Sequence, residues 1–172
     1  GHRTYLNTLD VRTLAIAGGS MIREKNGKLV DVGSRSAHIA GLAYACFQDP
    51  ELLRGAKLVH LRPSPKDSDD YAAIETPGGQ RFALTPSCAA NLLGIVPDTA
   101  FAKGNAEAAR QGFMALAEKL GKSPEECARE VLDISCRKIA RQIEALIQEY
   151  QLGRHTVELV GAGGGAAALV LH

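Results

Sequence analysis

The sequence predicts a single α/β domain in which a mixed sheet packs against long helices, and three observations support this fold class. Short apolar or alternating runs, typical of strands, occupy most of residues 14–84. Two long segments with helical periodicity follow at residues 105–120 and 123–150. A further strand is expected at residues 156–160, directly before a cluster of glycines. This order of elements favours an α/β or α+β architecture around one core.

The N-terminal half predicts short strands joined by tight turns. Residues 14–17 (Leu-Ala-Ile-Ala) predict a buried strand that ends in the turn signal Gly18-Gly19-Ser20. Asn26-Gly27 predicts a hairpin between two adjacent strands. Further strands are expected at residues 56–62, 71–76 and 81–84, of which the last two form a second hairpin.

Two short helices are expected among these strands. Ser36 is a candidate cap for a helix over residues 37–47. Thr85 followed by Pro86 marks the start of a second helix that stops at Gly94, because proline is favoured at the first helical position.

The helices of the C-terminal half carry the clearest signals. Residues 105–120 place apolar side chains at helical spacing, and Gly121 follows as a C-terminal cap. Ser123-Pro124 and the glutamates after it then open a helix that reaches residue 150. At a rise of 1.5 Å per residue this helix would span roughly 39 Å, which is long enough to cross a domain.

Composition and charge exclude several classes of protein. The net charge of +1 and the absence of a basic run argue against a nucleic-acid partner. No segment approaches the roughly 18 to 20 apolar residues that a membrane span requires, and the N-terminus shows no signal-peptide pattern. The four cysteines are far apart and form no metal-binding pair, so we expect reduced thiols in a cytoplasmic protein.

The glycine cluster near the C-terminus is the strongest functional signal. A strand, then Gly161, Gly163, Gly164 and Gly165, then alanines suited to a helix start would place backbone N–H groups and positive dipole character near a ligand. Three interpretations compete: a turn that serves only packing, a Rossmann dinucleotide site, or a corner that receives the adenosine or phosphate side of a nucleotide. The Rossmann fold requires a helix, a second strand and a distant acidic residue, whereas seven residues follow Gly165.

Three stretches in order resemble the hydantoinase/oxoprolinase family. The first combines Gly18-Gly19-Ser20 with residues 32–37, and is similar to the family's GGGS and VGPxSAG segments. The second, residues 84–94, resembles its DANLVLG region. The third runs from residue 105 through the long helix to Gly163-Gly164, where the family has a strand and GGAGP. The match covers most of residues 11–170.

This resemblance implies a lobe of an actin-like (ASKHA, ribonuclease H-like) ATPase core, with residues 123–150 as a connecting helix and residues 57–83 as an added strand and hairpin. It implies ATP-dependent ring opening of a cyclic amide such as a hydantoin or 5-oxoproline. Gly163, Gly164 and Gly165 would shape the adenosine side, within the strand and glycine corner at residues 156–172. Gly18, Gly19 and Ser20 would face the cleft between lobes.

The acidic phosphate loops of the family (DxGGT) do not occur in this sequence. We therefore expect a fragment that is inactive by itself and that shares an ATP–Mg²⁺ site with the rest of a longer chain or with a second subunit. Departures from the family motifs leave two other possibilities. One is an actin-like regulatory or reactivating ATPase module that acts on a partner enzyme, and the other is a non-catalytic fragment.

The remaining polar residues assign no catalytic group and no metal ligand. Asp31 precedes Gly33 and is a candidate for a metal-bound water or, more simply, a turn aspartate. The acidic loop with Asp67, Asp69 and Asp70 lacks the spacing of a calcium loop. Arg137, Lys138 and Arg141 are expected on a solvated helix face. His38 is assigned to the surface or to packing.

Overall fold

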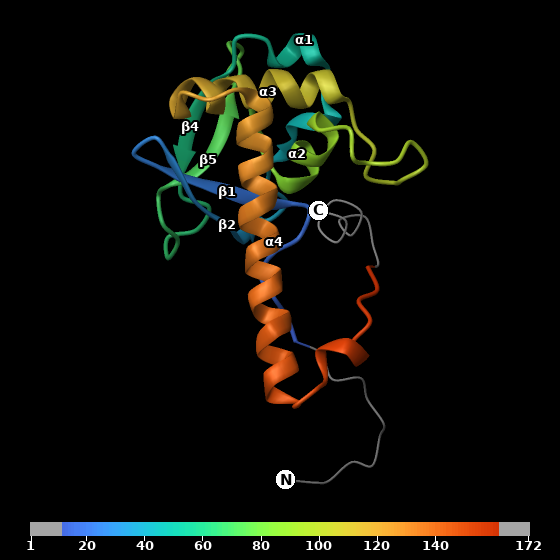
Figure 1. The fold of residues 1–172 in the computed structure, drawn as a ribbon. Coiled ribbons are helices and arrows are strands. Elements are labelled where there is room, and N and C mark those ends of the chain that lie inside the picture. Colours follow the sequence, from blue (N-terminus) through green and yellow to red (C-terminus); the bar gives the residue numbers. More distant parts are fainter. Residues whose placement is uncertain (1–11, 162–172) are drawn as a thin grey trace, which may run out of the picture.

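The structure, a computed structural model, describes residues 12–161 and combines one curved sheet with helices (Figure 1). The strands are β1 (Ser20–Lys25), β2 (Lys28–Ser36), β3 (Ala43–Tyr44), β4 (Lys57–Leu61), β5 (Tyr71–Glu75) and β6 (Arg81–Ala83). The helices are α1 (Pro50–Leu53), α2 (Pro86–Leu92), α3 (Ala106–Leu120) and α4 (Pro124–Glu149), with 3₁₀ turns η1 (Ala45–Phe47) and η2 (Arg154–Thr156). The expected mixed α/β fold class is confirmed.

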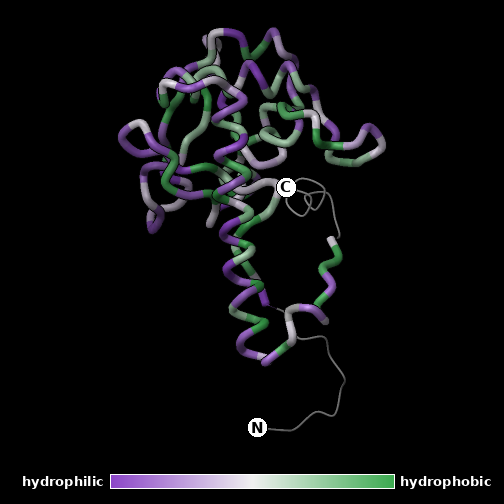
Figure 2. Tube along the Cα trace, in the orientation of Figure 1, coloured by the Kyte–Doolittle hydropathy of each residue, from purple (hydrophilic) through white to green (hydrophobic). Residues whose placement is uncertain are grey.

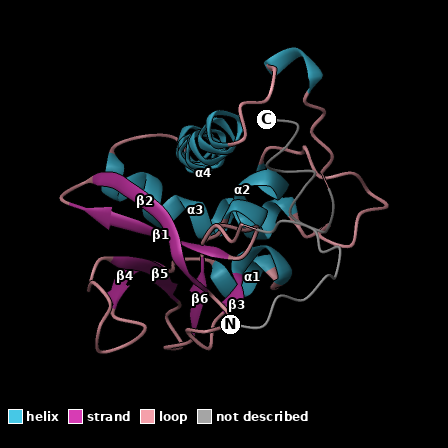
Figure 3. Cartoon of the chain, turned by 90° about the horizontal axis from the view of Figure 1, so that it is seen from below, coloured by secondary structure: helices cyan, strands magenta, loops and turns pink. Residues whose placement is uncertain are grey.

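The sheet has the order β2-β1-β5-β6-β3, and β4 also pairs with β5. Neighbouring strands are antiparallel except for β3 and β6, which run parallel. β1 and β5 share the single residue pair Arg23 and Tyr71. Figure 3 shows that the sheet is curled, with α2, α3 and α4 on one side of the strands.

Local signals placed several elements correctly. Asn26 and Gly27 form the β1–β2 turn with φ values of 55° and 74°, the pair of positive angles that a tight hairpin favours. The Thr85 side chain caps α2, and Ser123 and Glu126 form a reciprocal capping box at the start of α4. The two long helices of the C-terminal half therefore begin where the sequence predicts.

Helix α3 packs closely on the sheet because Gly112 faces it. A Cβ atom at Gly112 would lie 3.0 Å from the Ala45 Cβ and the Leu84 Cδ2. Phe113 and Leu116 are fully buried beside this contact. The main core cluster contains residues from β1, β2, β5, β6, α2, α3 and α4, so one apolar core joins the sheet and the helices.

Helix α4 is buried over its first half alone. Its buried residues are Cys127, Ala128, Val131, Leu132 and Ser135. From Cys136 onward no side chain is buried, and the helix extends beyond the sheet (Figure 1). Figure 2 shows hydrophobic and hydrophilic residues alternating along this protruding half. Within residues 12–161, no helix has the length and hydropathy that crossing a membrane requires.

Three expected elements are wrong. Residues 14–17 form no strand and lie partly or fully exposed. The helix over residues 37–47 is replaced by a turn, β3 and η1, because Gly41 adopts a φ of 70° that an α-helix excludes. Residues 156–160 form no strand: Thr156 ends η2, and Val160 is 83% exposed. A strand needs a partner for its backbone hydrogen bonds, and none of the described strands pairs with residues 14–17 or 156–160.

Candidate functional site

The first two segments that carry the family resemblance meet at one end of the β1–β2 pair. Ser20, after the two glycines, pairs with Ser36 at the end of β2. The Ala37 N–H donates to the Gly19 carbonyl over 2.9 Å, and the Ser87 N–H at the start of α2 donates to the Gly18 carbonyl over 2.9 Å. The structure thus brings Gly18-Gly19-Ser20, the end of β2 and the start of α2 into direct contact. We call this arrangement the glycine–serine turn cluster.

Gly19 is required by the close approach of Tyr44. A Cβ atom at Gly19 would lie 1.8 Å from the Tyr44 Oη and 2.8 Å from its Cζ. Burial raises the pKa of the Tyr44 phenol, which also stacks on Phe47. Glycine at this position therefore lets the Tyr44 ring pack against the cluster, and we call this contact the Tyr44 seal. The sequence did not predict this role of Gly19, because Tyr44 comes from another segment of the chain.

Ser20 stabilises the turn itself. Its side chain is buried with the residue 5% exposed, and its Oγ accepts the Ala17 N–H over 2.9 Å. The Ser20 N–H in turn donates to the Ala17 carbonyl over 3.0 Å. The contacts of Gly18, Gly19 and Ser20 are thus internal to the protein, and their part in nucleotide binding stays a prediction.

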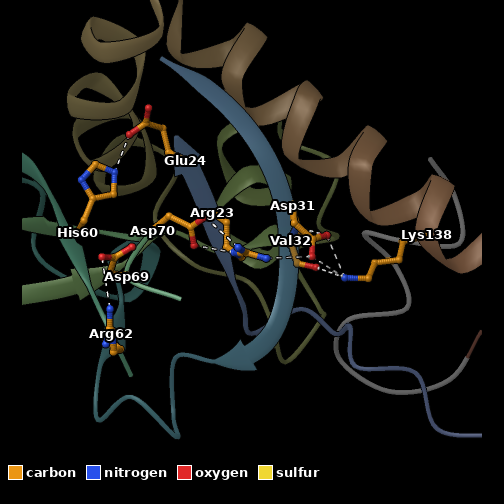
Figure 4. A network of polar contacts seen from close by, with 9 residues as sticks. All are labelled: Arg23, Glu24, Asp31, Val32, His60, Arg62, Asp69, Asp70 and Lys138. Carbon is orange, nitrogen blue, oxygen red and sulfur yellow. Dashed lines mark hydrogen bonds and ion pairs between the residues drawn. The ribbon is translucent and has the colours of Figure 1, made fainter. Parts of the chain in front are cut away.

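Lys138 fastens α4 to β2 (Figure 4). Its ammonium donates to both Asp31 carboxylate oxygens, over 2.9 and 3.1 Å, and to the Val32 carbonyl over 2.9 Å. Gly33 follows with a φ of 87°, and a Cβ atom there would lie 2.3 Å from the Ala15 carbonyl oxygen. Asp31 is therefore an ion-pair partner. Lys138 is paired with it, whereas the sequence predicted that Lys138 lies on a solvated helix face.

Each carboxylate of the acidic loop pairs with a different arginine. Asp70 accepts two hydrogen bonds from Arg23, over 2.7 and 2.8 Å, and this pairing lowers the pKa of Asp70 and raises that of Arg23. Arg23 also lies over the Tyr71 ring, 5.6 Å from its centroid. Asp67 pairs with Arg35, and Asp69 pairs more loosely with Arg62. The loop carboxylates are thus committed to structural ion pairs.

Glu24 is a polar core residue that sequence reasoning missed. It is 1% exposed, and its carboxylate contacts His60 Nε2 over 2.6 Å and accepts the Gly27 N–H over 2.6 Å (Figure 4). Glu24 lies two residues after the fully buried Ile22, so strand alternation places it on the core-facing side. A charged residue at an expected core position is the signal that could have found this pair.

The four cysteines form no disulfide, as expected. Cys46, Cys88 and Cys127 are buried and Cys136 is half-buried. Burial raises the pKa of Cys127 to about 11, so this thiol is protonated and unreactive at neutral pH.

The expected magnesium site has no ligand cluster in the part of the chain that the structure describes. Within residues 12–161, no group of three or more His, Cys, Asp or Glu side chains could hold a metal ion. Asp31, the carboxylate beside Gly33, is already neutralised by Lys138. Gly163, Gly164 and Gly165 lie outside the described residues, so the expected adenosine corner has no structural account here.

The fold and the site define a mixed α/β domain whose glycine–serine turn is sealed by a tyrosine and flanked by a helix tethered through a lysine. A family model described as hydantoinase/oxoprolinase matches residues 1–172, the whole chain. The chain therefore belongs to the hydantoinase/oxoprolinase family, and the resemblance inferred from the sequence is confirmed. No curated protein and no solved structure gives a significant match.

Proposed function

We propose that this chain is a nucleotide-binding lobe of an ATP-dependent cyclic-amide hydrolase of the hydantoinase or 5-oxoprolinase type. The observation that carries the proposal is family membership over the whole chain, which indicates a function of the cyclic-amide hydrolase type. The meeting of the first two resembling segments in the turn cluster supports it further, because residues that share a site must be brought together by the fold.

In this proposal Gly18, Gly19 and Ser20 face a cleft between lobes, and Gly163 to Gly165 contact the adenosine. The Tyr44 seal and the backbone bonds to Ala37 and Ser87 hold the turn in one geometry. Such a rigid turn is suited to positioning a bound group without a loss of conformational freedom on binding. Within residues 12–161 no group of three or more potential metal ligands is present, so in this proposal another part of the protein or a partner subunit contributes to the metal and phosphate-transfer site.

The test is a calorimetric titration, with ATP and Mg²⁺, of the full-length protein that contains this lobe together with any partner subunit. We expect saturable binding that weakens at least tenfold in Gly164→Val, because a branched side chain would block close approach of the backbone to the ligand. Gly78→Ala is the matched control, since an added Cβ there meets nothing closer than 3.8 Å. Absence of nucleotide binding, or equal weakening in both variants, would overturn the proposal. A screen of hydantoins and 5-oxoproline for ADP release then tests the substrate class.

A further inference from the structure

A surface pocket of about 470 Å³ lies between β2 and α4, apart from the turn cluster. Its lining comprises Val30, Asp31, Ile134, Arg137, Lys138 and Arg141. Three of these residues are cationic and one is anionic, so the described residues of the lining carry a net charge of +2 at neutral pH. A pocket of this size and charge is suited to a compact anionic ligand.

Arg137 and Arg141 supply the unsatisfied charge. They are four residues apart on α4, so their side chains project from the same side of the helix one turn apart. Both are exposed, and neither forms an ion pair within the described residues 12–161. Two like charges at this spacing destabilise a helix unless an anion lies between them.

Asp31 does not cancel this charge. Its carboxylate oxygens accept two bonds from Lys138, one of them also accepts the Val32 N–H, and Arg23 lies 3.9 Å away. Within the pocket lining, the aspartate and the lysine are therefore already paired with each other (Figure 4). The two arginines are left to meet a ligand.

The rest of the lining is apolar. Val30 is 49% exposed on β2, and Ile134 is half-buried on α4. These side chains reduce competition from water near the guanidinium groups, which strengthens their hydrogen bonds to an anion.

We propose that this pocket binds the phosphate group of a small molecule. A phosphate dianion matches the net charge of +2, and each guanidinium can offer two parallel N–H donors to its oxygens. The site uses side chains from the middle of α4, and Gly163 to Gly165 are not needed for the argument.

The test is an NMR titration of the ¹⁵N-labelled protein with inorganic phosphate and with pyrophosphate at constant ionic strength. We expect saturable shifts confined to residues 30–32 and 134–141, and at least tenfold weaker binding in the double variant Arg137→Gln/Arg141→Gln. Glutamine retains helix propensity, and circular dichroism checks that the fold is intact. Arg129→Gln is the control, because Arg129 is exposed on the same helix outside the lining.

Absence of shifts in the wild type, or unchanged binding in the double variant, would overturn the proposal. Equal weakening by Arg129→Gln would also overturn it, since the attraction would then come from overall charge. An acetate titration at the same ionic strength distinguishes phosphate from a monoanionic carboxylate. If acetate binds as tightly as phosphate, the pocket does not select phosphate and the proposal is contradicted. Gly164→Val is expected to bind phosphate in this pocket as tightly as the wild type does. The phosphate titration therefore tests the pocket separately from the nucleotide proposal.

Discussion

The carboxylates of this protein differ sharply in how far they are removed from water. Glu24 is 1% exposed and holds both His60 and the Gly27 N–H, whereas the Asp69 side chain is 78% exposed and meets Arg62 at 3.4 Å. A buried polar group that loses its partner costs more than a surface pair, which water solvates almost equally well. The two carboxylates therefore predict opposite outcomes for the same kind of substitution.

Glu24→Ala is expected to lower the free energy of unfolding by about 1–3 kcal/mol, because His60 and the hairpin amide both lose their partner. Asp69→Ala is expected to leave it unchanged within measurement error. Urea unfolding followed by circular dichroism measures both. Equal losses in the two variants would show that the burial of Glu24 is not what stabilises the hairpin.

The Gly19–Tyr44 contact predicts a coupled effect on stability. Gly19→Ala places a methyl group where the tyrosine hydroxyl lies, so it is expected to cost roughly 1–3 kcal/mol through overpacking. Adding Tyr44→Leu removes the clash, and the double variant should be less destabilised than the sum of the single variants. Thermal unfolding of all four proteins gives the coupling energy, and simple additivity would contradict the contact.

Asp70 predicts an acid-sensitive contribution to stability. The Arg23 bonds hold the folded-state pKa of Asp70 below the ordinary value of 3.8, so its carboxylate stabilises the fold above that pH. This contribution is lost as the pH falls through the lower folded-state pKa. Asp70→Asn should therefore flatten the decline in unfolding free energy between about pH 5 and pH 3. Asp69→Asn is the control, and an unchanged slope in Asp70→Asn would contradict the assignment.

At the scale of elements, α4 consists of two halves held by different means. The first half contributes five residues to the buried interior, and the second contributes none. Lys138 ties the middle of the helix to β2, and Arg12 bonds to Glu149 and Tyr150 at its end. Exposed backbone hydrogen bonds open more readily than buried ones, so the two halves should differ in protection.

Hydrogen exchange is expected to be slow at residues 127–135 and fast at residues 142–149. Lys138→Met should move the boundary toward the N-terminus of α4, because it removes the tether to Asp31 and Val32. Arg129→Met, on an exposed part of the buried half, should leave the boundary in place. Uniform protection along the wild-type helix would contradict this division.

At the scale of the whole molecule, the sequence predicted the features that depend on neighbouring residues and missed those that depend on long-range contacts. The Asn26-Gly27 turn, the Thr85 and Ser123 caps and both long helices follow from neighbours in sequence. The expected strands at residues 14–17 and 156–160 failed because a strand depends on a partner that local sequence does not specify.

The candidate site was also predicted only in its local part. The sequence identified Gly18-Gly19-Ser20 as a turn and as a candidate binding segment. The Tyr44 seal, the Glu24–His60 pair and the Asp31–Lys138 tether were missed, because the fold alone brings their members together. Asp31 and Lys138 are 107 positions apart in sequence.

The main core cluster, which joins the sheet and the helices, predicts cooperative unfolding of the whole domain. Phe113 is fully buried in that core, so Phe113→Ala is expected to cost about 3–5 kcal/mol. Its neighbour Met114 is 50% exposed, and Met114→Ala should have little effect. In Phe113→Ala, the far-ultraviolet signal of the helices and the near-ultraviolet signal of the tyrosines should shift to the same lower midpoint. Separate midpoints would mean that the sheet and the helices unfold as independent units, and the turn cluster would then lack the rigid support that its proposed role requires.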